Sequence, residues 1–308
     1  MKDGSECGNQ MILLSATEII AQRVFNTLYI YLDIVFLVGL CAMLVWKKKY
    51  LTLLFGLAGG ILYFIVDYGI FHLALGTRSI QGGDMFAVLL WMSMSYGLTN
   101  FVWIWLWFSR DSRKFEWTAL ICVWWFCAPM LAQTFGAGMP VVKIQRTTGA
   151  YHGAMALILL VGYVGAIIYN FIQKDAGKRL PLLWLAATGI AVQLGWEFSL
   201  LIGGIRSAEI GSVMQKLETL VVNSLLETNL GAVPLYCIYA LVTSRITERL
   251  KKRGKVGFTE RLAELNAVPL FRRRAAVAVE PVTTVADGRA EPGVGDASDK
   301  QLSGGGEK

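Results

Sequence analysis

The sequence predicts an all-α membrane protein built as a bundle of seven transmembrane helices. Of its 308 residues, 55% are hydrophobic and only 17% are charged, whereas soluble domains carry about 25% charged residues. A helix needs about 20 apolar residues to cross the hydrocarbon core of a bilayer. Seven segments qualify as spans, at about residues 26–46, 51–75, 85–108, 116–136, 150–172, 180–203 and 217–243.

The spans divide the chain into three parts. Residues 1–25 are expected to form an extracytoplasmic or lumenal segment, in which Ser15–Phe25 has the composition of a short interfacial helix. Residues 26–246 form the membrane domain. Residues 247–308 form a cytoplasmic tail that is first basic and then rich in proline, glycine and alanine, a composition predicted to stay disordered. Its basic part either contacts anionic lipid headgroups or serves as a stop-transfer flank.

The distribution of basic residues predicts the orientation of the spans. Basic runs follow the odd-numbered spans, at Lys47–Lys49, Arg110–Lys114, Lys174–Arg179 and Arg245–Lys255. The opposite loops hold fewer and more scattered basic residues, so the positive-inside rule places the N-terminus outside or in a lumen and the C-terminus in the cytoplasm. The net charge of +7 therefore reflects membrane topology, in the endoplasmic reticulum or the plasma membrane, and is no signal for nucleic acid.

A faint internal repeat relates the first three spans to the last three. Asp67 is followed by Arg78, and Glu197 is followed by Arg206 at a similar distance. The Ser-x-x-x-Thr-Asn pattern that ends at Asn100 recurs about 130 residues later in the last span. A 3+1+3 parallel repeat of this kind occurs in transporters and places sites at the repeat interface. Coincidence is the alternative.

Four carboxylic acids lie within the spans: Asp33, Asp67, Glu197 and Glu227. With a rise of 1.5 Å per helical residue, all four fall in one layer in the outer half of the membrane. Neither lysine nor arginine lies at that depth in any span, and burial without a cationic partner favours the neutral carboxyl. A protonated acid beside an ionised one suits general acid–base catalysis, proton-coupled transport or cation binding. Alternatively, each acid is a structural residue bonded to serine, threonine, asparagine or tyrosine.

Other polar and aromatic residues are expected near this layer. Asn223 shares a helix face with Glu227, and Tyr96 shares one with Asn100, because each pair is four residues apart. The ring of Trp196 could stabilise a cation, although packing is the simpler role for most aromatic residues. The only two histidines have no third nearby ligand, so neither a metal nor another cofactor is expected.

An acid in the second span and an acid followed four residues later by glycine in the last span form a family pattern. In this respect the chain resembles the small integral membrane terpene cyclases of fungal meroterpenoid and indole-diterpene pathways. Asp67 would match the first acid, and Glu227 with Gly231, in ETNLGAVPLY, would match the second. The chain departs from that pattern because Val66 precedes the acid of its second span, and its Trp-Glu pair, Trp196-Glu197, lies in the sixth.

The resemblance implies proton-initiated cyclisation of a prenylated, often epoxidised, lipophilic substrate without a cofactor. It also implies a prenyltransferase and an epoxidase as pathway partners. Asp67 or Glu227 would donate the proton, and Glu197 would hold or relay protons. Contacts to the substrate would come from Asp33, Tyr96, Asn100, Trp196 and Asn223.

A seven-span proton-coupled or sugar-type transporter is the alternative function. The 3+1+3 arrangement with Asn100 and Asn229 in equivalent spans favours it. The sequence lacks the Pro-Gln pair of sugar-efflux carriers, and its Pro181 and Pro234 are not at paired positions. A receptor or sensor is a third class, which only the number of spans favours.

Overall fold

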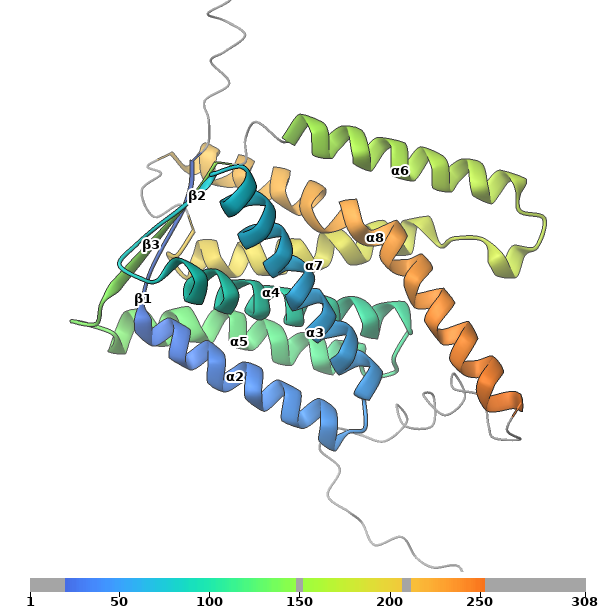
Figure 1. Ribbon diagram of the computed structural model, residues 1–308, viewed down its shortest axis with the longest axis horizontal. Helices are drawn as coiled ribbons and strands as arrows, with labels where there is room; N and C mark the ends of the chain where they lie inside the picture. The colour runs from blue at the N-terminus through green and yellow to red at the C-terminus, as the bar shows by residue number, and fades with distance from the viewer. Residues whose placement is uncertain (1–19, 148–151, 207–211, 253–308) are drawn as a thin grey trace, which may run out of the picture. The chain divides into compact units, whose positions relative to one another are not determined.

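The computed structural model describes residues 20–147, 152–206 and 212–252 (Figure 1). These residues all belong to one compact unit, Met1–Leu270. Most of the predicted N-terminal segment and nearly all of the predicted disordered tail lie outside the described residues.

Seven helical segments in the described part of the chain are long and apolar enough to cross a membrane, which confirms the predicted spans. They are α2 (Thr27–Trp46), α3 (Tyr50–Phe64) with its continuation η1 (Ile65–Ala74), α4 (Met85–Phe108), α5 (Lys114–Phe135), α6 (His152–Ile172), α7 (Leu182–Ile202), which follows the short 3₁₀-helix η3 (Ala176–Lys178), and α8 (Val213–Lys252). The second span changes from α-helix to π-helix at η1, a wide helical form that is frequent at functional sites. The last helix extends beyond its predicted span at both ends.

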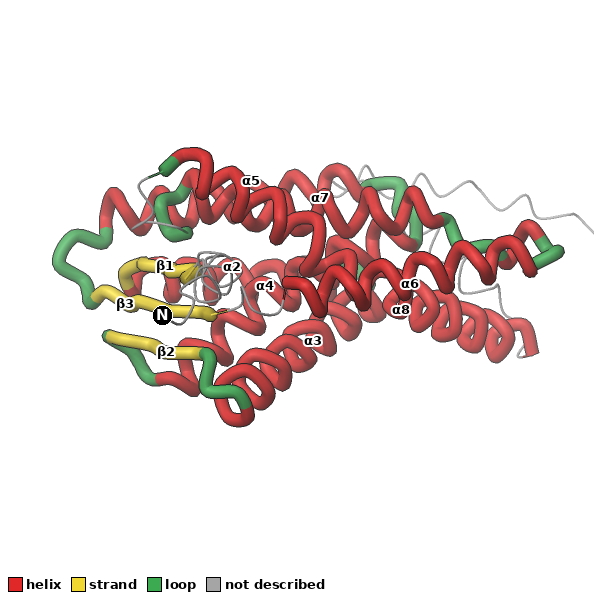
Figure 2. Tube along the Cα trace, turned by 90° about the horizontal axis from the view of Figure 1, so that it is seen from above, coloured by secondary structure: helices red, strands yellow, loops and turns green. Residues whose placement is uncertain are grey.

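The all-α prediction is incomplete, because three strands form an antiparallel sheet at one end of the helices (Figure 2). They are β1 (Ile20–Asn26), β2 (Arg78–Gln81) and β3 (Val141–Thr147), in the order β1-β3-β2. The interfacial helix expected at Ser15–Phe25 is wrong for its described part, which is the strand β1.

The sequence of β3 explains why it is a strand. Val142 and Ile144 are buried, whereas Val141 and Lys143, the residues that directly precede them, are exposed. This period of two is the pattern of a strand with one buried face. Cross-strand pairing places Phe25 beside Val142, so the sheet covers the helix ends with an apolar face.

Helix α4 forms the centre of the bundle. In its most apolar window 72% of the residues are buried, against 6% in α6. Small residues let α3 approach α4 closely, since a Cβ atom added to Gly97 would lie 2.6 Å from the Cα of Gly60 and 2.9 Å from the carbonyl oxygen of Gly59. Such small-residue contacts are the usual means of tight packing between membrane helices.

The end of the helices opposite the sheet is held by a buried ion pair. The ammonium group of Lys49, between α2 and α3, contacts the carboxylate of Asp111, between α4 and α5. Burial lowers the pKa of Lys49, and the charge of Asp111 opposes that effect. The two loops are therefore joined at a buried point.

Substitution of Gly97 by leucine tests the contact between α3 and α4. The added side chain has no space beside the α3 backbone, so we expect a loss of about 2 kcal/mol in the free energy of unfolding. Thermal unfolding in detergent measures this as a melting temperature lowered by several degrees. Gly162→Leu on α6 is the matched control, because nothing lies within 4 Å of its added Cβ. Equal melting temperatures for the two variants would contradict the close contact.

Candidate functional site

Asp67, at the start of η1, has a cationic partner that the sequence analysis did not expect. The Nη2 atom of Arg78 lies 2.9 Å from Oδ1 of Asp67, and both side chains are buried. The Oη atom of Tyr96 donates a hydrogen bond of 2.6 Å to the other carboxylate oxygen. The prediction that Asp67 lacks a cationic partner is therefore wrong.

Glu197, on α7, is also paired with arginine. Its Oε2 atom lies 3.1 Å from Nε of Arg206, and its Oε1 atom lies 3.8 Å from Nη2 of Arg23. All three side chains are buried. The expectation of an unpaired acid is wrong here too, because Arg23 and Arg206 lie outside the helices and reach the acid from a strand and from the segment after α7.

Asp33, on α2, is buried with a different type of partner. The indole Nε1 of Trp91 donates a hydrogen bond of 2.9 Å to its Oδ2 atom. Ser95 and the indole of Trp124 also lie close to this carboxyl group. Within the described residues Asp33 makes no ion pair, so neutral donors surround it.

Glu227, on α8, is held by a residue that the sequence analysis missed. The Nε2 atom of Gln193 donates a hydrogen bond of 2.7 Å to Oε2 of Glu227 and lies 3.4 Å from Oε1 of Glu197. The hydroxyl of Thr228 donates to the amide oxygen of Gln193 at 2.6 Å. Gln193 thus joins two of the predicted acids. Its position four residues before Glu197, inside an apolar span, is the signal that could have identified it.

Tyr63, on α3, lies near both Asp67 and Glu227. Its hydroxyl lies close to Thr228 and Asn100, and it is near enough to Asp67 and Glu227 for their charges to act on it. Its ring contacts that of Tyr96, with centroids 4.5 Å apart. We call Asp67, Glu227 and three side chains near one or both of them, Tyr63, Tyr96 and Gln193, the acid cluster.

The predicted binding residues are placed around this cluster. The ring of Trp196 lies beside that of Tyr96, with centroids 6.0 Å apart. Asn100 is 1% exposed, and neither of its amide atoms meets hydrogen-bond geometry with any described residue. Asn223 is also buried, one turn before Glu227, and its amide nitrogen has no hydrogen-bond partner among the described residues. A buried amide without partners is costly, so these two residues mark a place where a polar ligand or water would be stabilised.

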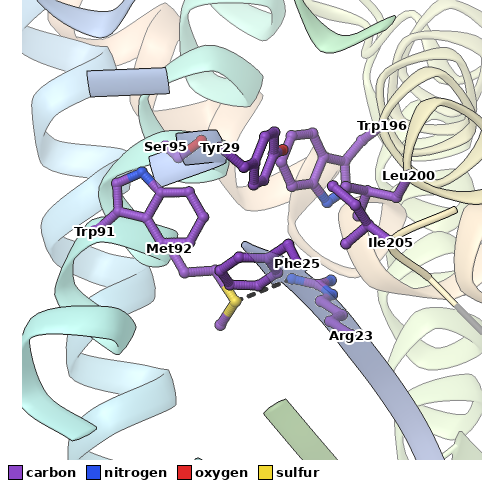
Figure 3. Close-up of a pocket in the computed structure, with 9 residues that line it drawn as sticks. All are labelled: Arg23, Phe25, Tyr29, Trp91, Met92, Ser95, Trp196, Leu200 and Ile205. Atoms are coloured by element: carbon purple, nitrogen blue, oxygen red, sulfur yellow. Dashed lines mark hydrogen bonds between the residues drawn. The ribbon is translucent and has the colours of Figure 1, made fainter. Parts of the chain in front are cut away.

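A pocket lies between the sheet and the helix ends, and two of the residues that line it, Arg23 and Trp91, contact Glu197 and Asp33 (Figure 3). Figure 3 shows the rings of Phe25 and Tyr29 between Trp91 on one side and Trp196 on the other. Arg23 enters from β1 and donates a hydrogen bond of 3.1 Å to the sulfur of Met92. The empty space, including the part open to solvent, is about 240 Å³. Because that figure includes open solvent, the space enclosed by the side chains has room for only about one water molecule.

Two further observations bear on identity. Among the described residues, no three histidine, cysteine, aspartate or glutamate side chains come together in a way that could hold a metal ion. No protein-family model, curated protein or solved structure matches this chain. The chemistry of the acid cluster is therefore the guide to function.

Substitution of Arg78 by methionine tests the ion pair with Asp67. The change leaves a buried carboxylate without its guanidinium, and breaking a buried pair in this way costs about 3–5 kcal/mol. The double variant Asp67→Asn with Arg78→Met removes both charges and should lose less stability. Unfolding with denaturing detergent measures the difference.

Lys178→Met provides the control for the loss of an arginine or lysine partner. Lys178 pairs with Asp175 at 3.6 Å, but both side chains are largely exposed, and exposed pairs contribute little. Stability should stay near that of the wild type. A double variant less stable than Arg78→Met alone would contradict the ion pair. It would mean that the Asp67 carboxylate is not destabilising when Arg78 is absent.

Proposed function

We propose that this protein is a membrane-embedded terpene cyclase that carries out proton-initiated cyclisation of a prenylated, often epoxidised, lipophilic substrate. The observation that supports this best is the acid cluster, in which Tyr96 donates a hydrogen bond to Asp67 and packs on Tyr63, which lies within electrostatic range of both Asp67 and Glu227. Aromatic rings stand between and beside the acids. A bundle of apolar helices gives a lipophilic substrate access from the bilayer.

The two acids have different partners, which suggests different roles. Glu227 makes no ion pair among the described residues and accepts a hydrogen bond from Gln193, so it can carry a proton. Asp67 is ion-paired with Arg78, an arrangement that needs the carboxylate ionised. Glu227 is therefore the proposed acid, and Asp67 is the proposed base or the negative charge that stabilises a cation. A pair of acids in unlike environments is the usual arrangement for acid–base work.

The proposed reaction conserves all atoms of the substrate. Glu227 gives its proton to the epoxide oxygen, the C–O bond breaks, and the carbon that is left electron-deficient is attacked by a π bond. Each attack moves the cation along the chain, where the faces of Tyr63, Tyr96 and Trp196 can stabilise it. Loss of a proton to a carboxylate ends the sequence, and the product is an isomer of the substrate. A prenyltransferase and an epoxidase would have to supply such a substrate.

Neutral substitutions of the two acids test this function. We expect Glu227→Gln and Asp67→Asn each to lower turnover by about 10²–10⁴-fold, the range of general acid–base catalysis. Product formation is measured by mass spectrometry in membranes of a host that supplies candidate prenylated epoxides, with the amount of each variant checked by immunoblot. Glu218→Gln is the control, since Glu218 is an exposed residue on the same helix.

Two results would contradict a cyclase. One is full turnover by both Glu227→Gln and Asp67→Asn. The other is uptake of a polar solute by proteoliposomes containing the purified protein, with loss of uptake in Asn100→Ala, which would favour a carrier instead.

We also propose that the sheet faces the extracytoplasmic or lumenal side and that the loop between α6 and α7 faces the cytoplasm. The support is the excess of basic residues in the loops opposite the sheet. In a chain without its own cysteines, Ser79→Cys on β2 should react with a membrane-impermeant maleimide in right-side-out vesicles. Asp175→Cys should react only after permeabilisation, because both positions are exposed to solvent but lie on opposite sides. The reverse labelling would invert the orientation.

A further inference from the structure

Gln193 donates a hydrogen bond to Glu227, the residue that the proposed function assigns as the proton donor. We propose that Gln193 is a positioning residue that determines which oxygen of Glu227 carries the proton. This inference rests on the proposed function, in which Glu227 is the acid. It concerns a residue outside the pattern of the family resemblance.

The orientation of the Gln193 amide is set by Glu197. Glu197 is ion-paired with Arg206 and is therefore a hydrogen-bond acceptor only. It faces the Nε2 atom of Gln193 at 3.4 Å. If the amide were turned over, its oxygen would face an ionised carboxylate in a buried site, which is unfavourable. The amide nitrogen must therefore point toward the acids.

The other contacts of Gln193 agree with this orientation. The amide nitrogen has two hydrogens, and it faces two carboxylate oxygens, one from Glu197 and one from Glu227. The amide oxygen accepts the hydroxyl hydrogen of Thr228. Gln193 is 2% exposed, so water does not compete strongly for these contacts. In this orientation every donor and acceptor of the amide has a hydrogen-bond partner. In the flipped orientation the amide would lose some of these partners.

The consequence for Glu227 follows from hydrogen-bond directions. Its Oε2 atom accepts a hydrogen from Gln193 at 2.7 Å. A proton on Oε2 would compete with the amide hydrogen for the same short contact, so the proton of a neutral Glu227 belongs on Oε1. Oε1 is thus the donor oxygen, and the substrate must meet that oxygen.

Close packing between α7 and α8 holds Gln193 near Glu227. Gly189 lies one turn before Gln193, and a Cβ atom added there would lie 2.2 Å from the side-chain oxygen of Asn229. The Cα of Asn229 would lie 3.3 Å from the same Cβ atom, so the two helices pack closely beside the contact of Gln193 with Glu227.

Infrared spectroscopy of the purified, full-length protein in lipid tests this assignment without any substrate. A protonated carboxyl group has a C=O band, and a hydrogen bond to the carbonyl oxygen lowers its frequency. The band of Glu227 is identified in a pH titration by its absence in Glu227→Gln. In Gln193→Leu this band should move to higher frequency, because Oε2 has lost its donor. Gln133→Leu is the matched control, since Gln133 contacts the backbone of Gly203 outside the acid cluster.

Turnover measurements distinguish a positioning role of Gln193 from a purely structural one. We expect Gln193→Leu to lower kcat by about 10- to 100-fold, the loss of one hydrogen bond to an acid that must be oriented, with KM little changed. Gln193→Met, which keeps the length of the side chain, should behave alike and serves if the leucine variant does not fold. A band that stays in place in both variants, or a band that moves while kcat does not, would overturn the proposal.

The infrared result also separates this proposal from the proposed function. If the band moves as expected but no substrate is cyclised by the wild type, Gln193 orients Glu227 and the cyclase assignment is the part that fails. If no band of Glu227 is found at any pH at which the protein is folded, Glu227 carries no proton and the positioning role is wrong.

Discussion

The burial of carboxylates among apolar helices is the constraint on which the rest of this structure depends. An ionised acid without a partner in such surroundings is highly unfavourable. The chain meets this cost at Asp67 and Glu197 with arginines that come from outside the spans, on β2 and after α7. The sheet is therefore part of the site: it carries Arg23 and Arg78 on its buried face and places them over the ends of the helices. Without a folded sheet, Asp67 would lose Arg78, and Glu197 would keep only Arg206 as a counterion from the described residues.

The sequence was sufficient for the helices and insufficient for the sheet. Apolar runs of about 20 residues have few structural alternatives in a bilayer, so all seven spans were predicted. The strands are short and lie in connecting segments, and Val141–Thr147 became recognisable as a strand only through the alternation of Val142 and Ile144. Whether the two halves of the bundle are a true repeat stays a prediction. The paired spacing of Asp67 with Arg78 and of Glu197 with Arg206 corresponds, however, to two ion pairs in the structure.

The site was predicted as a set of residues but not as a network. The acids, Tyr96 and Trp196 were recognised because each is unusual at its position in an apolar helix. Their partners were not recognised, because contacts between residues such as Asp67 and Arg78 depend on how a connecting segment folds back. Gln193 was missed for a different reason: an uncharged amide is less conspicuous than a carboxylate, although its burial is just as dependent on satisfied hydrogen bonds.

The division of the four acids into two types gives the arrangement its chemical meaning. Asp67 and Glu197 have guanidinium partners, whereas Asp33 and Glu227 are bonded to neutral donors, an indole and an amide. A guanidinium needs an ionised partner, but an indole or amide N–H can donate to either form of a carboxyl group. The two acids with neutral partners can therefore gain or lose a proton without breaking an ion pair. Of these, Glu227 is joined through Gln193 to the ionised Glu197, and it shares Tyr63 with the ionised Asp67. Glu227 thus lies beside two carboxylates whose charge is balanced by arginine, while its own contacts to the described residues come from neutral donors.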